Sequence, residues 1–109
     1  RGFTYVDDIA RGVILALQPV GYEIFNLGGH EDITIRELIE RIERLVGRKA
    51  HIVQHPFPQA DMKSNLADVS KAGRILGWEA HVSLDEGLRR TVDWYNANRA
   101  WAKELSLNV

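Results

Sequence analysis

The 109-residue chain has no cysteine, and it contains only three prolines and one methionine. Without cysteine it can form neither a disulfide framework nor a thiolate metal site, and this composition fits a cytoplasmic protein. No apolar run approaches the roughly 20 residues that a membrane-spanning helix needs. The first residues also lack the charged and then apolar layout of a secretory signal. We therefore expect a cytoplasmic location and no membrane partner.

The chain also lacks an excess of charge of either sign, because 14 Lys and Arg stand against 15 Asp and Glu. This balance gives no strong attraction to nucleic acid or to an anionic membrane, although a local basic patch can still bind an anion. The hydrophobic fraction of 45% and the charged fraction of 27% are those of an ordinary globular protein. Length and composition together indicate one small domain with a modest core and exclude disordered, collagen-like and coiled-coil classes.

The first expected helix covers residues 7–17. Asp7 or Asp8 would cap its first turn, and Pro19 follows its end. Its apolar side chains recur at helical spacing, at Ile9, Val13, Ile14 and Leu17.

The second expected helix, over 35–46, has the clearest signals in the chain. Thr34 and Glu37 form the capping-box pattern, and Gly47 supplies a left-handed stop. One face is continuously apolar. The other carries charges that we expect to form two i,i+4 ion pairs on a solvated surface, Glu37 with Arg41 and Glu40 with Arg44.

Two further helices are expected in the second half. Asp68 can cap a helix that covers 69–76 and stops at Gly77. Ser83 and Glu86 form a second capping-box pattern, which opens a long helix. The apolar residues of this last helix share one side and are Leu84, Leu88, Val92 and Tyr95.

Two short strands are expected between these helices. The run YEIFNL at 22–27 is rich in aromatic and β-branched residues and predicts a buried strand, and 50–54 predicts a second. Pro56 and Pro58 impose an extended segment that follows, as far as Met62. Two isolated strands make a marginal sheet. They therefore need partner strands that lie outside this chain or in a second chain.

Several patterns suggest chemistry but have simpler explanations. His51 and His55 would start roughly 13 Å apart on a strand, too far to share one metal ion. The pair Gly28-Gly29 resembles the start of a phosphate loop, but a tight turn explains it better because G-x-G-x-x-G is absent. No G-x-S-x-G nucleophile and no Tyr four residues before a Lys occurs. The three tryptophans are expected mainly in the core.

Two residues have the chemistry of a nucleotide site. Arg1, at the end of a short strand-like stretch, can donate twice to the anionic oxygens of a diphosphate. Asp61, in the proline-constrained extended segment, can accept the protons of both hydroxyls of a ribose diol. Spacing alone does not distinguish these roles from ordinary solvated side chains.

Five blocks in order carry a family resemblance that covers nearly the whole chain: RGFTYVDDIARGVILAL, YEIFNLGG, ITIRELIERIERLVGRKA, ADMKSNLADVSKAGRILGW and VSLDEGLRRTVDWY. Together they resemble the C-terminal part of the NAD-dependent sugar-nucleotide epimerases and dehydratases of the extended short-chain dehydrogenase/reductase family. The similarity is greatest to epimerases that act on UDP-glucuronate or UDP-glucose, followed by dTDP-glucose 4,6-dehydratases.

The resemblance implies an α/β fold class, in the form of a mainly helical fragment with a few short strands that belongs to an extended Rossmann-type fold. Residues 1–109 would be a single substrate-binding part. The N-terminal Rossmann half, with the NAD loop and the catalytic Tyr-Lys pair, would precede it. The chain would then bind a nucleotide sugar, hold no catalytic residue, metal or cofactor of its own, and depend on the NAD of a full-length parent for catalysis.

The resemblance also implies site residues. Arg1 matches the arginine that contacts the substrate diphosphate, and Asp61 matches the acidic residue that holds the nucleotide ribose. Asn26 matches a residue near the cleft, and we expect its role to be structural before it is one in binding. The family often has Arg or Gln three residues before the acidic residue, whereas this chain has Pro58, which weakens the choice of subfamily more than the choice of family.

Two other readings stay open at this stage. The chain can be a stand-alone, non-catalytic binding or interaction module derived from the same family, or an unrelated small α/β domain. In either family reading, the strand at 22–27 would present an unpaired apolar edge. We therefore expect a homodimer that covers this edge.

Overall fold

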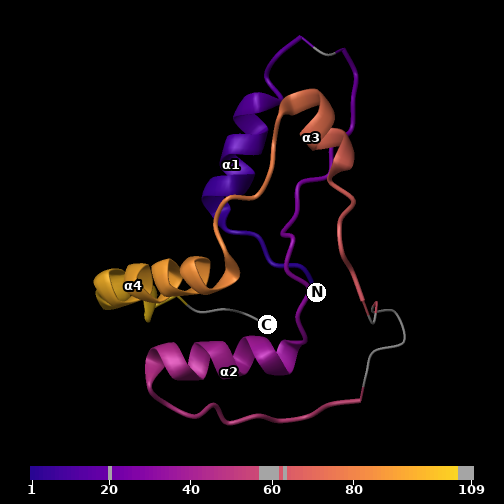
Figure 1. The fold of residues 1–109 in the computed structure, drawn as a ribbon. Helices are drawn as coiled ribbons and strands as arrows, with labels where there is room; N and C mark the ends of the chain where they lie inside the picture. Colours follow the sequence, from indigo (N-terminus) through magenta and orange to yellow (C-terminus); the bar gives the residue numbers. More distant parts are fainter. Residues whose placement is uncertain (20, 57–61, 63, 106–109) are drawn as a thin grey trace.

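The computed structural model describes residues 1–19, 21–56, 62 and 64–105. Its helices are α1 (Val6–Leu15), α2 (Ile35–Val46), α3 (Ser70–Leu76) and α4 (Leu84–Ala102). They pack as two pairs, α1 against α3 and α2 against α4, which extended segments join (Figure 1). Within the described ranges the only β pairing is an isolated antiparallel bridge between Gly2 and Asp32. The expected mainly helical class is confirmed.

Helix α2 forms as its sequence signals predict. The Thr34 hydroxyl accepts from the Glu37 amide at 3.1 Å, and the Glu37 carboxylate accepts from the Thr34 amide at 2.7 Å. The Thr34 backbone hydrogen bond is the main reason that the pKa of Glu37 lies below its ordinary value. Gly47 ends the helix with a φ of 71°, in the left-handed region that favours glycine.

The second capping box forms only in part. The Ser83 hydroxyl accepts from the Glu86 amide at 3.3 Å, as expected. The Glu86 carboxylate, however, accepts from Arg89 and Arg90 instead of from the Ser83 amide. Hydrogen bonds from these two guanidinium groups lower the pKa of Glu86 to about 2. A local arginine pair therefore replaces the second half of the box.

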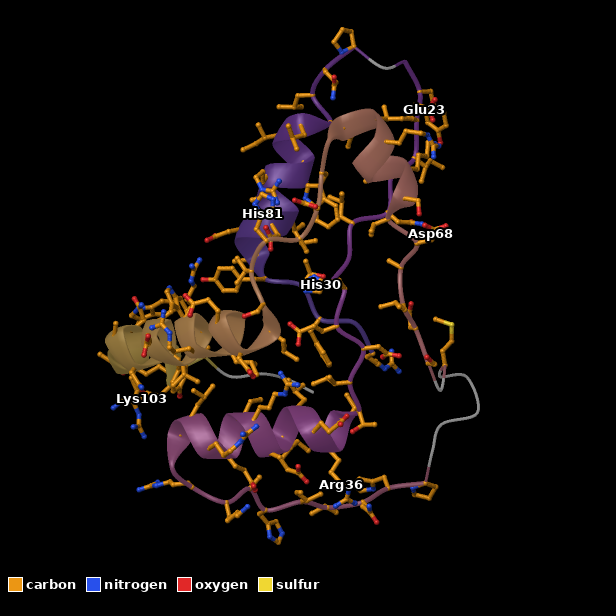
Figure 2. The ribbon with its side chains drawn as sticks, viewed as in Figure 1. Glu23, His30, Arg36, Asp68, His81 and Lys103 are labelled. Atoms are coloured by element: carbon orange, nitrogen blue, oxygen red, sulfur yellow. The ribbon has the colours of Figure 1, made fainter. Side chains whose placement is uncertain are left out.

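The start of α1 differs from the expectation. The helix begins at Val6, and neither Asp7 nor Asp8 caps it, because the N-cap residue is Tyr5 and makes no side-chain cap hydrogen bond. Asp8 is only 2% exposed. Its Oδ2 accepts from the amides of His81 and Val82 at 3.0 and 2.8 Å. The carboxylate thus fixes the segment before α4 against α1, where Figure 2 shows His81.

The core lies between α1 and α3 and centres on Trp78, which is 1% exposed. Its indole Nε1 donates to the Asp8 carbonyl at 2.7 Å. Gly12 faces it closely, since a Cβ there would lie 2.9 Å from the indole nitrogen and 2.5 Å from Leu27. Trp94 and Trp101 lie instead on the exposed part of α4 and pack edge to face, with ring centroids 5.7 Å apart. The expectation of mainly core tryptophans therefore holds for Trp78 alone.

The two expected strands do not form. Residues 22–27 and 50–54 are coil, and Tyr22 and Ile24 are 91% and 67% exposed. Only Phe25 and Leu27 from the first run pack against the core. A strand requires a neighbour for its backbone hydrogen bonds, and the described part of the chain offers none to either run.

Long-range ion pairs replace the expected pairs within α2. Arg41 contacts Asp85 at 2.8 Å and Glu31 at 3.6 Å. Glu31 also accepts from the amide of Leu84, the first residue of α4, at 2.8 Å. Arg44 donates to the carbonyl of Glu40 rather than to its carboxylate. Glu31 and Arg41 therefore fix the start of α4 to α2.

Candidate functional site

Three segments that are distant in sequence meet at the N-terminal end of the described chain. The amide of Ile33 donates to the Arg1 carbonyl at 3.2 Å, and the amide of Gly2 donates to the Asn65 carbonyl at 3.2 Å. Segment 1–4 therefore lies between 28–33 and 64–67. Backbone hydrogen bonds on both sides fix the direction in which Arg1 leaves this junction.

The Gly28-Gly29 pair belongs to the same junction. A Cβ at Gly29 would overlap the carbonyl of Phe3, and one at Gly28 would lie 2.7 Å from the Cβ of Ala67. Neither glycine has a positive φ. The pair is thus neither a phosphate loop nor the tight turn favoured from its sequence. Its missing side chains let three backbone segments approach one another.

We expect Gly29→Ala to lower the free energy of unfolding by about 2 kcal/mol, because the added methyl collides with the Phe3 backbone, which cannot rotate away. Urea denaturation followed by circular dichroism measures this change. Gly73→Ala is the matched control, because its Cβ would meet only the Trp78 carbonyl at 3.6 Å, an ordinary contact. Equal stability of the two variants would contradict the role of Gly29.

Arg1 lies between two hollows. The first, of about 350 Å³, is lined by Arg1, Met62 and Ser64 with the start of α2. The second, of about 270 Å³, includes Gly28 and Gly29. The guanidinium Nη2 of Arg1 donates to the Met62 carbonyl at 3.2 Å. The side chain of Arg1 is about one third exposed.

The three site residues expected from the sequence have different outcomes. Arg1 lies against Met62, the residue that follows Asp61 in the chain. Asp61 itself lies outside the described residues, as does Pro58. Asn26 lines neither hollow at Arg1; its side-chain amide donates to the Asp68 carbonyl at 3.3 Å, next to the start of α3 (Figure 2). Asn26 therefore has a structural contact here.

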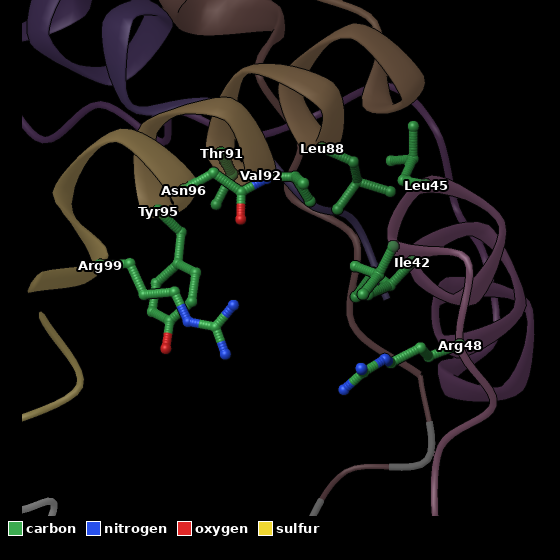
Figure 3. A pocket seen from close by; sticks show the side chains of 10 residues that line it. Ile42, Leu45, Arg48, Leu88, Thr91, Val92, Tyr95, Asn96 and Arg99 are labelled. Atoms are coloured by element: carbon green, nitrogen blue, oxygen red, sulfur yellow. The ribbon is translucent and has the colours of Figure 1, made fainter.

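A third hollow, which the sequence did not single out, lies between α2 and α4. This groove has a volume of about 570 Å³ and an apolar floor formed by Ile42, Leu45, Leu88, Val92 and Tyr95. Figure 3 shows the guanidinium groups of Arg48 and Arg99 at its opening. The apolar faces of both helices were the signal that could have revealed it.

The described ranges contain neither a metal-binding cluster nor a membrane-spanning helix. No cluster of three His, Cys, Asp or Glu side chains suited to a metal ion occurs there. His51 and His55 are exposed on the coil after α2. None of the helices in this part of the chain has the length and apolar character needed to cross a membrane.

Comparison with known sequences decides the family. The sequence model of the GDP-mannose 4,6 dehydratase family matches residues 1–91. The chain belongs to this family. UDP-glucuronate 4-epimerase of Thermodesulfobacterium geofontis is 49% identical over 108 residues, covering 98% of this chain and 33% of that protein. The expected resemblance to epimerases and dehydratases of the extended short-chain dehydrogenase/reductase family is confirmed.

Solved structures agree with the family membership. UDP-glucose 4-epimerase of Thermotoga maritima, solved with UDP-glucose, matches 91% of this chain and 32% of its own with a TM-score of 0.83 and 33% identity. UDP-glucuronic acid 4-epimerase of Bacillus cereus, in complex with UDP-glucuronic acid and NAD, matches 88% and 32% with a TM-score of 0.73 and 32% identity. The chain thus spans about a third of the length of these relatives.

Proposed function

We propose that this chain is the sugar-nucleotide-binding portion of an NAD-dependent epimerase or dehydratase, and that it is not catalytic by itself. The observation that carries the proposal is the position of Arg1. Its guanidinium lies between two hollows and beside Met62, so an anion in either hollow would meet a planar donor. Relatives solved with UDP-glucose or UDP-glucuronic acid support a nucleotide sugar as the anion.

The proposed roles follow the chemistry of the two residues. Arg1 would donate hydrogen bonds to diphosphate oxygens, and the backbone contacts on both sides of it would limit the entropy lost on binding. Asp61 would accept from the ribose hydroxyls. Asn26 would support the site indirectly, through its hydrogen bond to the Asp68 carbonyl.

The glycine-rich NAD loop and the Tyr-Lys pair that the family resemblance implies are not found in this sequence. The proposal therefore assigns NAD to the rest of a full-length parent, in line with the relative solved in complex with NAD. No catalytic step is assigned to this chain.

The test is a titration of the chain with UDP, UDP-glucuronate and UMP, followed by amide shifts in NMR spectra. We expect Arg1→Ala to weaken UDP binding about 10- to 100-fold, because a charge-assisted bidentate contact is lost. Asp61→Ala should weaken UDP and UMP alike, since both contain the ribose. Arg74→Ala, an exposed arginine of α3 that lines neither hollow at Arg1, is the matched control.

The same titration can contradict nucleotide binding by this chain. An absence of shifts at millimolar UDP-glucuronate would mean that this chain alone does not bind the nucleotide. The alternative function, a stand-alone interaction module, would then be favoured by the exposed apolar groove between α2 and α4.

The proposal extends to location and assembly. A cytoplasmic location is supported by the absence of cysteine from the sequence. A homodimer is supported by the large apolar side chains that remain exposed, including Val13, Ile14 and Leu17 of the first helical segment. A dimer would therefore cover these side chains and not the strand edge expected at 22–27, because that strand does not form.

A further inference from the structure

Glu31 connects one wall of the candidate nucleotide site to helix α4. The residues that follow it, 32–35, line the hollow of about 350 Å³ together with Arg1. The Glu31 carboxylate accepts from the amide of Leu84, the first residue of α4, at 2.8 Å. Because α4 packs against α2, this one side chain fixes the wall of the hollow to a helix pair (Figure 1).

The backbone of Arg1 is bound to the same wall. The Ile33 amide donates to the Arg1 carbonyl at 3.2 Å, and Gly2 forms an antiparallel bridge with Asp32. Ile33 is 8% exposed, so the wall is anchored in the interior. A shift of the wall would therefore move the backbone of Arg1, and with it the guanidinium that lies between the two hollows.

The Glu31 carboxylate is well suited to hold this position. The first amides of a helix have no acceptor within the helix, and a carboxylate is favourable beside them. Arg41 of α2 lies 3.6 Å from Glu31 and 2.8 Å from Asp85, the second residue of α4. The side chains of Glu31 and Arg41 are only 29% and 24% exposed. The wall, α2 and α4 thus meet at one partly buried carboxylate.

Glu43 makes a comparable contact away from the site. Its carboxylate accepts from the Ala50 amide and from the Lys49 ammonium, both at 2.7 Å, and its side chain is 11% exposed. It fixes the coil that follows α2 and lines neither hollow at Arg1. Glu31 and Glu43 therefore share their chemistry and differ in the segment that each one holds.

The charge of Glu31 and its contact with α4 have opposite effects on an anion. A carboxylate repels a diphosphate, so removal of the charge alone would strengthen nucleotide binding. Loss of the contact would release the wall and Arg1, and a donor that must be ordered during binding gives a weaker complex. The direction of the change in affinity distinguishes the two effects.

We propose that Glu31 is a positioning residue of the nucleotide site, which holds residues 32–35 and the backbone of Arg1 in place by binding the Leu84 amide. It touches no substrate in this role and acts through Arg1. The inference rests on the nucleotide site of the proposed function.

The UDP titration tests this inference with three substitutions of Glu31. Glu31→Ala removes the acceptor of the Leu84 amide and should weaken UDP binding about 10-fold. Glu31→Asp keeps the charge but is one methylene too short, and it should weaken binding in the same way. Glu31→Gln keeps an oxygen at the original reach and should bind UDP as the wild type does. Glu43→Ala, the matched control, should leave UDP binding unchanged.

The free chain gives a second readout that needs no nucleotide. The Gly2 residue lies across the antiparallel bridge from Asp32, and its amide donates to the Asn65 carbonyl. Its NMR signal therefore reports on the backbone next to Arg1. We expect this signal to move in Glu31→Ala and Glu31→Asp, and to keep its wild-type position in Glu31→Gln and Glu43→Ala.

The possible outcomes separate the inference from the proposed function. Unchanged or tighter UDP binding by a folded Glu31→Ala variant, or an equal loss in Glu43→Ala, would overturn the positioning role. If circular dichroism shows that Glu31→Ala is unfolded, equal UDP binding by Glu31→Asp and Glu31→Gln would overturn it. A wild-type chain that does not bind UDP would refute the nucleotide site, and the Gly2 signal would then decide alone whether Glu31 positions Arg1.

Discussion

Trp78→Ala is expected to lower the free energy of unfolding by about 4 kcal/mol, the largest effect of any single substitution that we consider. The side chain is 1% exposed and fills the space between α1 and α3. Truncation leaves a cavity there and also removes the donor that the Asp8 carbonyl accepts at 2.7 Å. Since whole domains are stable by only about 5–15 kcal/mol, this loss removes a large fraction of the stability of the protein.

The chain supplies a matched control for this experiment. Trp94→Ala removes a residue of the same type that is 53% exposed and contacts Trp101 edge to face. Its cost should stay near 1 kcal/mol. Urea denaturation followed by circular dichroism compares the two variants, and a similar midpoint for both would show that Trp78 does not hold the core.

Asp8→Ala should lower the free energy of unfolding by about 3 kcal/mol. The carboxylate accepts hydrogen bonds from the amides of His81 and Val82 and from the Arg11 guanidinium. Removing it leaves partly buried donors without an acceptor, which costs more than the hydrogen bonds themselves are worth. Asp7→Ala is the control, because Asp7 is exposed and lies 3.7 Å from Arg90, so its loss should change stability by no more than about 0.5 kcal/mol.

The pH dependence of stability gives this prediction a second readout. Burial raises the pKa of Asp8, but hydrogen bonds from Val82, Arg11 and His81 and the charge of Arg11 outweigh it, so the pKa lies below its ordinary value of 3.8. A carboxyl with a lowered folded-state pKa stabilises the protein above its unfolded-state value and loses this contribution as the pH falls through the folded-state value. The stability gap between wild type and Asp8→Ala should therefore narrow below pH 3.8; a gap that does not change with pH would contradict the charged role.

The ends of the helices could be predicted from the sequence where the signals lie within one helical turn. The Thr34 and Glu37 box, the Gly47 stop and the Gly77 stop form as expected, because each depends on residues within one turn of the helix end. Helix α3 begins at Ser70, one residue later than expected, and Asp68 still accepts from the Ser70 amide at 3.0 Å.

Features that depend on contacts between residues far apart in the sequence could not be predicted from such local signals. Asp8 has the residue type and place of an N-cap, yet its partners lie more than 70 residues away. The run at 22–27 has strand composition, but no neighbour in the described chain can complete a ladder. Arg41 pairs with Asp85 and Glu31 rather than with Glu37, because α4 carries Asp85 and the Leu84 amide holds the Glu31 carboxylate at the start of α4.

The candidate site was predictable to the extent that it depends on residue chemistry. A planar cation at Arg1 suggested an anion, and the structure adds the two hollows and the backbone junction that orient it. The crossing of three backbone segments at Gly28 and Gly29 could not be read from the sequence, since a glycine pair serves equally for a turn, a phosphate loop or a close approach. The role of Asp61 stays a prediction.

The pairing of α2 with α4 has a consequence for the order in which the protein is made. Val46 leaves the ribosome 56 residues before Ala102, so at about 5–20 residues per second the apolar side of α2 is without its helical neighbour for roughly 3–10 seconds. Glu31 is also made long before Leu84, whose amide it binds. The nascent chain thus presents an amphipathic helix to the cell before that helix can be covered, which makes it a natural client of chaperones that hold exposed apolar segments during translation.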